Sequence, residues 1–274
     1  MIVHLIDGTY ELFRQFYGRK RFKKDGDHPL GAAAGVCGSV LQMIEGGATH
    51  IGVATDHVIE SFRNDLWPGY KTGAGVDPAL RSQFEPLEEA LDAMGVVVWP
   101  MVELEADDAL ASAARIAAAD PEAEQVCIWS PDKDLGQCVD RDRIVQVDRR
   151  ADAIRDAAAI REKFGVDPAL IPDLLALVGD SADGYPGIKG IGKVGAARML
   201  NQYGPIESFP ADAMADDRRE LALLFKDLAT LRSGEQLFAA ADDLRWEGPA
   251  EAFADVAERL GDERLLERSL AAPR

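Results

Sequence analysis

The chain has few cysteines and no long apolar segment. Its 274 residues include three cysteines, an odd number without a C-x-x-C pair, at Cys37, Cys127 and Cys138. We therefore expect neither a disulfide framework nor a cysteine zinc site. No apolar run approaches the roughly 18 residues that a membrane helix needs, and the N-terminus lacks the pattern of a signal peptide. These absences favour a protein of the reducing cytoplasm without a membrane partner.

Basic residues are also scarce. The 30 Lys and Arg residues face 48 Asp and Glu residues, a formal net charge of −18, and an acidic surface repels the phosphates of nucleic acids. Residues 185–204 are an exception, because they carry three bases and no acid. A second basic run follows residue 18. Such runs are usually solvated loops, but these two are where we expect a phosphate backbone to lie, at Arg19, Lys20, Arg21, Lys189, Lys193 and Arg198.

The N-terminal half alternates short apolar runs with longer helical patterns. Five β-branched-rich runs have the length of strands, at residues 2–6, 51–54, 96–99, 126–129 and 144–147. Helical spacing lies between them, most clearly at residues 84–94 and 106–119. Strands that alternate with helices predict an α/β fold, with a mostly parallel sheet flanked by helices. The hydrophobic content of 47% is sufficient for its core.

The strand signals stop near residue 160. Helical patterns follow at residues 171–178, 194–203, 218–231 and 252–260. There is no long linker between the two halves and no internal repeat. We therefore expect the helical part to pack directly on the sheet.

Aspartates follow three of the predicted strands. Asp7 ends the first and Asp56 the second, and Asp132 and Asp134 come soon after the strand at 126–129. In open parallel sheets the functional crevice lies beyond the carboxyl ends of the strands. These side chains are therefore expected to converge at one edge.

Three more acids open the helix predicted at residues 106–119, namely Glu105, Asp107 and Asp108. At about 100° per residue Glu105 and Asp108 share a face, and Asp107 points elsewhere in the same turn. Acids at a helix N-terminus also complement the helix dipole. By itself this cluster therefore has an ordinary structural interpretation.

A glycine-rich turn follows two further acids, Asp180 and Asp183. The turn at residues 187–192 lies between two predicted helices. Its glycines permit positive φ and expose backbone amides to a phosphate, with a helix N-terminus behind them. An ordinary helix-loop-helix corner is the alternative, but the excess of bases at 185–204 favours a sequence-independent clamp on a DNA backbone.

The nine carboxylates need a cation if they converge. Uncompensated carboxylates repel each other and are costly to bury. Oxygen ligands without nearby His or Cys point to Mg²⁺ or Mn²⁺ rather than zinc. Magnesium keeps several waters, so this set is too large for one ion. It predicts a two-metal site of the kind that activates water for displacement at phosphorus.

In this order the motifs resemble the 5′-nuclease family, which includes the N-terminal 5′-3′ exonuclease domain of bacterial DNA polymerase I, phage 5′-exonucleases and flap endonucleases. The resemblance extends from Asp7 to about residue 205. Because the chain ends at Arg274 with no polymerase domain, we expect a stand-alone protein. The segments that carry the resemblance are Ile6-Asp7-Gly8, Asp56 with Ser61-Phe62-Arg63, Gly69-Tyr70-Lys71, Glu105-Ala106-Asp107-Asp108, Asp132-Lys133-Asp134-Leu135, and Gly179-Asp180 through Gly192.

The resemblance implies two regions. The first is a PIN-like nuclease core at residues 1–160 with a short helical arch at about 71–95. The second is a helical DNA-binding region at 161–274, which holds a helix-three-turn-helix motif, of the helix-hairpin-helix type, at about 171–204.

The resemblance also implies a cofactor set of two Mg²⁺ or Mn²⁺ ions, with a K⁺ ion held by backbone carbonyls of the glycine-rich turn at residues 187–192, called the hairpin below. Asp132 and Asp134 lie between the two metal clusters, and Asp180 and Asp183 belong to the second. The first cluster comprises Asp7, Asp56, Glu105, Asp107 and Asp108.

Further roles carry over residue by residue. Lys71 matches an active-site lysine at the base of the arch, where an ammonium stabilises charge developing on the scissile phosphate. With it, Asp7, Asp132 and Asp134 are the expected catalytic residues. Relatives usually carry an arginine where this chain has Ala74, so Arg81 is the only base at 72–94. The implied DNA contacts are Arg63, Lys71, Gly187, Lys189, Gly190, Gly192, Lys193 and Arg198.

The sequence therefore predicts a structure-specific nuclease, a 5′-3′ exonuclease or 5′-flap endonuclease, in replication or repair. Its expected partner is branched or 5′-ended duplex DNA with a single-stranded 5′ flap. One alternative is a PIN-like ribonuclease that acts on RNA or RNA–DNA hybrids, and the DNA-type hairpin argues against RNA alone. Another is a non-catalytic protein that binds DNA junctions, and the complete set of carboxylates argues against it.

Overall fold

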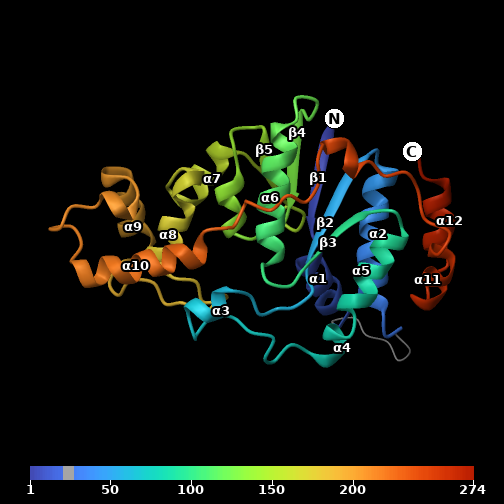
Figure 1. Cartoon of the computed structure of the whole chain (residues 1–274), viewed down its shortest axis with the longest axis horizontal. Coiled ribbons are helices and arrows are strands. Elements are labelled where there is room, and N and C mark those ends of the chain that lie inside the picture. The colour runs from blue at the N-terminus through green and yellow to red at the C-terminus, as the bar shows by residue number, and fades with distance from the viewer. Residues whose placement is uncertain (21–27) are drawn as a thin grey trace.

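The structure is a computed structural model that describes residues 1–20 and 28–274, except for the side chains of residues 19 and 20. The expected basic run at Arg19, Lys20 and Arg21 therefore lies outside the described side chains, and its role stays a prediction. Figure 1 shows a central sheet with helices on both faces and a helical region beyond one end of it.

Six strands form one sheet in the order β3-β2-β1-β4-β5-β6. They are β1 (Ile2–Asp7), β2 (His50–Asp56), β3 (Val97–Met101), β4 (Gln125–Trp129), β5 (Ile144–Asp148) and β6 (Ala153–Arg155). The first five are parallel and confirm the predicted strands. The antiparallel edge strand β6 was not predicted, because its three residues are too few to show a period. The chain order reverses beside β1, the position at which such sheets form a crevice.

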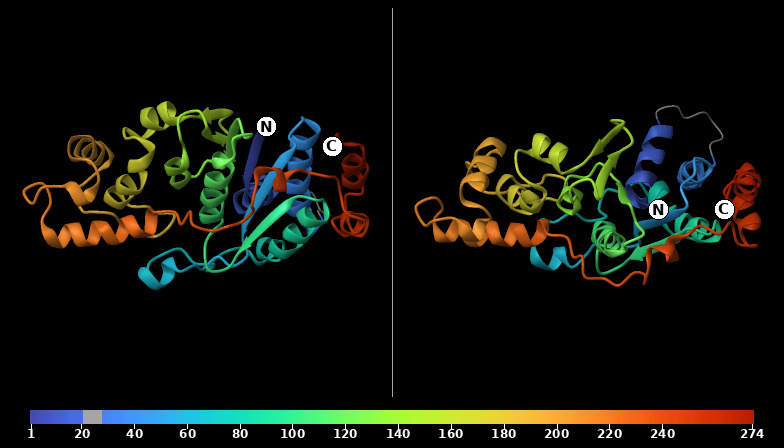
Figure 2. Two further views of the ribbon diagram at one scale, coloured as in Figure 1. Left: turned by 45° about the horizontal axis from the view of Figure 1, so that its top comes forward. Right: turned by 90° about the horizontal axis from the view of Figure 1, so that it is seen from above.

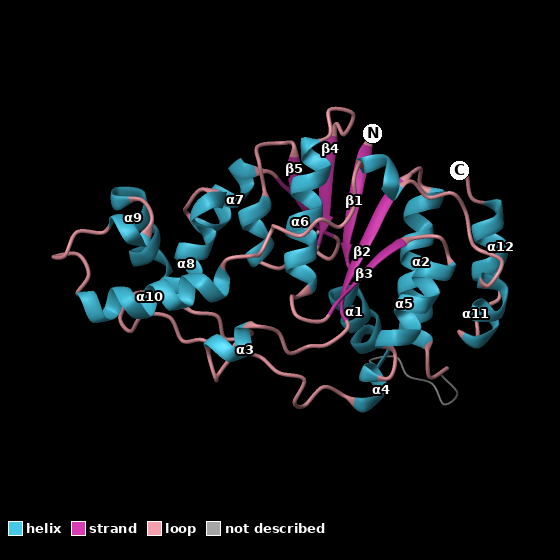
Figure 3. Ribbon diagram, viewed as in Figure 1, coloured by secondary structure: helices cyan, strands magenta, loops and turns pink. Residues whose placement is uncertain are grey.

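Helices cover both faces of the sheet (Figure 3). Alternate side chains of each strand therefore face opposite layers. Ile6 and Val53 lie in the core beneath α1, α2 and α5, whereas Val3 and Leu5 lie in the core beneath α6. The short helices α3 and α4 lie in the connection from β2 to α5. The helices of this half are α1 (Gly8–Lys20), α2 (Gly31–Glu45), α3 (Arg63–Leu66), α4 (Pro78–Arg81), α5 (Phe84–Ala93) and α6 (Ala106–Ala119).

The next helices form a separate core beyond one edge of the sheet, in all the views of Figures 1 and 2. Leu174, Leu177 and Phe225 are buried in this core. The expectation that this part packs directly on the sheet is therefore wrong for α8 to α10. The elements are η1 (Asp134–Cys138), α7 (Ala157–Phe164), η2 (Pro168–Leu170), α8 (Ile171–Val178), α9 (Lys193–Tyr203), η3 (Ile206–Ser208) and α10 (Asp216–Ala229).

The chain then returns to the sheet. After α10 it runs past α6, where the Ser112 hydroxyl donates to the Arg232 carbonyl (3.2 Å), and the Trp246 indole donates to the Met94 carbonyl (2.8 Å). The last elements, η4 (Ala241–Leu244), α11 (Phe253–Arg259) and α12 (Arg264–Ala271), lie near β2, α5 and α2. The division at residue 160 stays a prediction. Among the described residues, every helix is too short or too polar to cross a bilayer.

Candidate metal centre

The carboxyl edge of the sheet holds a cavity of about 380 Å³. Most of the predicted acids meet there, although they come from five separate parts of the chain. Asp7 and Asp56 end neighbouring strands, and α6 begins above them. Acidic side chains that line the cavity are Asp7, Asp56, Glu105, Asp107, Asp132 and Asp183.

Short hydrogen bonds hold the two strand-end aspartates. The Tyr10 amide donates to Asp7 Oδ1 (2.8 Å) and the Ser130 hydroxyl to Asp7 Oδ2 (2.9 Å). The Ala106 amide, in the first turn of α6, donates to Asp56 Oδ1 (2.8 Å). Ser130 was not predicted, although a hydroxyl directly after a strand that ends in this crevice was a usable signal.

Two of the cavity carboxylates, Asp7 and Asp107, resist ionisation in the absence of a cation. Burial raises the pKa of Asp7 to about 7, and the nearby Asp56 and Asp132 carboxylates add to the shift. Burial also raises the pKa of Asp107 well above its usual value, with repulsion from Asp132 and Asp7. A divalent cation would reverse this balance by favouring the charged forms.

A second cluster lies beside the cavity. Asp134 begins η1, and Asp180 and Asp183 follow α8; one carboxylate oxygen from each lies within 4.8 Å of the others. Asp134 Oδ1 is buried and has no hydrogen-bond partner among the described residues. Burial raises the pKa of Asp183 to about 6 and that of Asp134 well above its usual value. Lys133 forms an ion pair with Asp180.

These donors fit divalent ions with a preference for oxygen. The described residues that converge here contribute carboxylate oxygens, and an orphaned buried oxygen such as Asp134 Oδ1 is what a missing cation would leave. The two clusters are too rich in charge for Lys71 and Lys133 to neutralise. The residues present therefore fit a metal centre with more than one ion.

Lys71 extends into the same cavity. Its ammonium lies 2.8 Å from Glu105 Oε2 and 3.3 Å from Asp183 Oδ1, so it bridges both clusters. Burial would lower the pKa of Lys71, but the Glu105 and Asp183 carboxylates raise it well above its usual value. The lysine therefore stays charged. The Tyr70 hydroxyl also donates to Glu105 Oε2 (3.3 Å), a contact that was not predicted.

Glu105 and Asp108 share a face of the first turn of α6, as predicted, because both contact Arg63. The placement of Asp108 in the first metal cluster is nevertheless corrected. Asp107, not Asp108, lines the cavity with Glu105. Asp108 is fully buried, and its two oxygens accept hydrogen bonds from Nη2 and Nη1 of Arg63, at 2.7 and 2.8 Å. The backbone amides of Glu105 and Arg232 also donate to Asp108. With both oxygens engaged, Asp108 is not placed to bind a metal ion.

Arg63 is likewise not a surface residue. Its side chain is 1% exposed, because α6 and the chain after α10 enclose it. The expected contact with a DNA phosphate is therefore corrected. The serine, phenylalanine and arginine at 61–63 gave no signal of burial, because a lone arginine in a loop is usually solvated.

The glycine-rich turn lies between α8 and α9, as predicted. Gly187 and Gly190 have φ of +68° and +86°, values that residues with a Cβ atom rarely adopt. Lys189, Lys193 and Gly192 are exposed, and so is Arg198 further along α9. No side chain of the described residues caps the N-terminus of α9 at Gly192. Its first amides are free to bind an anion.

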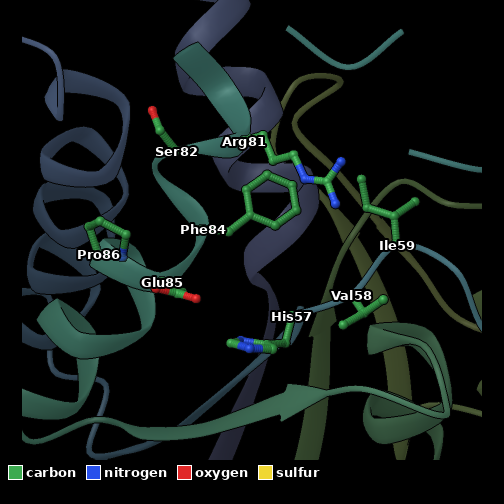
Figure 4. Close-up of a pocket in the computed structure, with 8 residues that line it drawn as sticks. All are labelled: His57, Val58, Ile59, Arg81, Ser82, Phe84, Glu85 and Pro86. Carbon is green, nitrogen blue, oxygen red and sulfur yellow. The ribbon is translucent and has the colours of Figure 1, made fainter. Parts of the chain in front are cut away.

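A second cavity of about 470 Å³ opens next to the first, and Ile59 lines both (Figure 4). The Arg81 guanidinium points toward Ile59 across this cavity. His57 Nδ1 forms a hydrogen bond with Glu88 Oε2 (2.7 Å). Helix α5 packs into the core through Leu87. The predicted arch at about 71–95 therefore includes a helix that belongs to the core, and residues 72–83 precede that helix.

The fold and the site define a class of α/β protein in which acids at the carboxyl edge of a parallel sheet form a metal centre beside a helical region. Within this class the chain belongs to the 5′-3′ exonuclease family. Residues 2–165 match the model of the 5′-3′ exonuclease N-terminal resolvase-like domain, and residues 166–252 match the 5′-3′ exonuclease C-terminal SAM fold. The predicted family and fold class are confirmed.

Known proteins agree with this assignment. The chain is 32% identical to DNA polymerase I of Bacillus caldotenax over 96% of its own length and 32% of that protein. It therefore spans about a third of the length of this relative. The fold is similar to a bacteriophage T5 D15 flap endonuclease complex with DNA and metal ions (TM-score 0.68, 17% identity, 99% of this chain and 97% of that one). It is also similar to the catalytic core of Rad2 with DNA substrate (0.61, 14%, 98% and 91%).

We expect the metal-free protein to gain stability as the pH falls from about 8 to about 5. The folded-state pKa values of Asp7 and Asp183, about 7 and about 6, exceed the unfolded value, so the folded state binds more protons in this window. The stabilising contribution is present at low pH and is lost as the pH rises through these values. The check is the Tm in EDTA across this range.

Magnesium should reverse the trend. At pH 8, a concentration about 100 times its dissociation constant should raise the Tm by roughly 5–10 °C. A Tm that is flat in EDTA across the window, or that does not respond to Mg²⁺ at pH 8, would contradict a metal centre built on these carboxylates.

Proposed function

We propose that this protein is a structure-specific nuclease, a 5′-3′ exonuclease or 5′-flap endonuclease that hydrolyses phosphodiesters of branched or 5′-ended DNA. The observation that carries the proposal is one cavity in which acids from both clusters meet Lys71, in a chain of the 5′-3′ exonuclease family. The T5 and Rad2 proteins of similar fold are complexes with DNA, which supports a DNA substrate.

The metal ligands are drawn from both clusters. Two ions, Mg²⁺ or Mn²⁺, would supply Lewis acidity at the phosphoryl oxygens and lower the pKa of water, the chemistry of two-metal sites. Asp108 is left out because Arg63 occupies it. The proposed ligands are Asp7, Asp56, Glu105, Asp107, Asp132, Asp134, Asp180 and Asp183.

Lys71 orients and stabilises the scissile phosphate. Its charged ammonium is held between Glu105 and Asp183, and 32% of its side chain stays exposed to the cavity. A phosphate that enters this space meets a fixed positive charge, which stabilises the negative charge that grows as the bond breaks. The lysine needs no proton transfer for this role.

The hairpin holds the duplex at a distance from the metal centre. Its exposed bases and the uncapped amides of α9 contact the backbone rather than the base edges, so binding is independent of sequence. Carbonyls of the same turn are the proposed ligands of a K⁺ ion. The residues assigned to this contact are Lys189, Gly190, Gly192, Lys193 and Arg198. The expected contact of Gly187 is corrected, because this glycine is buried against Gly179.

Replacing Lys189 and Lys193 together by Gln should weaken DNA binding at every sequence. Each lost phosphate contact should reduce the slope of log K against log salt by about 0.9, whereas turnover at saturating DNA should stay the same. Salt-dependent binding to a 5′-flap duplex, with Ca²⁺ in place of Mg²⁺, measures this slope. The matched control replaces Arg259 and Arg264 by Gln on α11 and α12, at the other end of the molecule (Figure 1). Equal losses in both variants would mean that the hairpin is not the contact.

Cleavage of a labelled 5′-flap duplex in Mg²⁺ tests the proposed activity. We expect cleavage of a substrate whose 5′ end is free. The same assay on a substrate with a blocked 5′ end reports whether a free end is required. An all-DNA flap compared with an RNA-containing flap separates the DNase from the ribonuclease. If neither Mg²⁺ nor Mn²⁺ supports cleavage, the proposal is refuted, and the alternative of a non-catalytic DNA-binding protein is favoured.

A further inference from the structure

Arg63 is a fully buried cation at the meeting point of three parts of the chain. It starts α3, and its side chain is 1% exposed. Burial would lower the pKa of its guanidinium, but the nearby Asp108 and Glu105 carboxylates raise it. A charge in this position is retained only where each of its donors has a partner.

Two of these partners are carbonyls at and just beyond the end of α10. Arg63 Nε donates to the Leu228 carbonyl (2.8 Å) and Nη2 to the Thr230 carbonyl (3.3 Å). The last carbonyls of a helix lack intrahelical donors, and the helix dipole favours a cation there. Arg63 therefore anchors the carboxyl end of α10 to the nuclease core.

The same guanidinium forms a bidentate pair with Asp108, which in turn accepts the amides of Arg232 and Glu105 (2.7 and 2.9 Å). Asp108 thus draws together the chain after α10 and the residue that precedes α6. The pair joins the two segments through hydrogen bonds of fixed, fork-like geometry.

The remaining contact leads into the metal cavity. Arg63 Nη1 lies 3.1 Å from Glu105 Oε1, the oxygen that also accepts the Ser61 hydroxyl (2.6 Å). The other oxygen, Oε2, faces Lys71 (2.8 Å). Arg63 and Ser61 therefore fix which oxygen of Glu105 is presented to the cavity.

We infer that Arg63 is a positioning residue that couples Glu105 of the metal centre to the end of α10, an inference that rests on the proposed function of that cavity. Movement of α10 shifts the guanidinium, and through it the carboxylate. The helical region and the metal centre are thus held as one unit, and disrupting the link costs metal affinity as well as stability.

The test is Arg63→Lys, which keeps the charge but loses the fork. Mn²⁺ binding to the DNA-free protein, followed by the EPR signal of free Mn²⁺, should weaken by about 10- to 100-fold, as expected for a lost outer-sphere partner. In the flap assay kcat should fall more than KM rises. Ser112→Ala is the matched control, because it loosens the same segment at Arg232 and Glu235 without touching Glu105. Its Mn²⁺ affinity should match that of the unmodified protein.

The double variant Arg63→Met with Asp108→Asn serves where Arg63→Lys does not fold. It removes both buried charges, so neither is left unpaired, and the same loss of Mn²⁺ affinity is expected.

Hydrogen exchange of the unmodified protein adds a measurement that needs no variant: Mn²⁺ should slow exchange of the Arg232 amide. Unchanged Mn²⁺ affinity in a folded Arg63 variant, or unchanged exchange at Arg232, overturns the inference. An unmodified protein that binds Mn²⁺ but does not cleave DNA refutes only the proposed function, because the binding and exchange measurements still decide the coupling.

Discussion

Asp134→Asn should lower cleavage of a 5′-flap duplex by at least about 100-fold, the upper end of what the loss of a mere outer-sphere partner costs. Asp134 Oδ1 is buried without a partner among the described residues and belongs to the cluster with Asp180 and Asp183. An amide keeps the shape of the side chain but removes the charge that a divalent ion requires. The measurement is kcat in saturating Mg²⁺, and adding Asp132→Asn should eliminate the remaining activity.

The same substitution should stabilise the metal-free protein. Because burial and repulsion raise the pKa of Asp134 well above its usual value, the charged form opposes folding at pH 8, and an amide relieves that cost. The gain in Tm should shrink as the pH falls, because protonation removes the charge that opposes folding.

Asp148→Asn is the matched control for Asp134→Asn. Asp148 is also a buried aspartate, at the carboxyl end of β5, but it pairs with Arg155 (2.8 Å) and accepts two backbone amides. These partners outweigh burial and lower the pKa of Asp148. The control should therefore lose stability and retain cleavage. Full activity in Asp134→Asn, or an equal loss in Asp148→Asn, would remove Asp134 from the metal centre.

Lys71→Ala should lower kcat by about 10²- to 10³-fold, the effect of removing one preorganised charge or donor from a transition state. The ammonium is the cation that bridges Glu105 and Asp183 in the cavity. DNA affinity should change far less, because the proposed duplex contacts lie on the hairpin. Single-turnover cleavage of prebound flap DNA measures the chemical step.

Lys226→Ala provides the comparison for Lys71→Ala. Lys226 on α10 also bridges two carboxylates, Asp173 at 2.9 Å and Glu207 at 2.8 Å, with 21% of its side chain exposed. It lies in the helical core, outside the metal cavity. If both variants lose kcat equally, the effect of Lys71 is structural, and its proposed role in charge stabilisation is wrong.

The acidic excess of the chain does not argue against DNA. Six of the 48 acids line one cavity, where bound divalent ions would offset their charge, whereas the exposed bases Lys189, Lys193 and Arg198 gather around the hairpin. We expect this protein to bind DNA weakly without divalent ions, with an affinity that depends on both salt and metal.

Much of the fold and the position of the site followed from local sequence patterns. Short apolar runs rich in β-branched residues located the five parallel strands, and period-3.6 spacing located helices such as α6 and α8, within a few residues. Asp7 and Asp56 could be assigned to one edge because parallel strands of a sheet end on the same side. The turn at 187–192 was evident because glycines allow a backbone that other residues resist.

Only the tertiary structure decided which side chains of a motif serve the site. Helical spacing separates Asp107 from Glu105 and Asp108, but it does not decide that Asp107 faces the cavity and Asp108 faces Arg63. That difference depends on the chain after α10, whose carbonyls and amides enclose Arg63 and Asp108 from far along the sequence. Helical spacing fixes the angle between neighbouring side chains, but what packs against each face depends on segments that meet only in the folded chain, so burial and ion pairing could not be read locally.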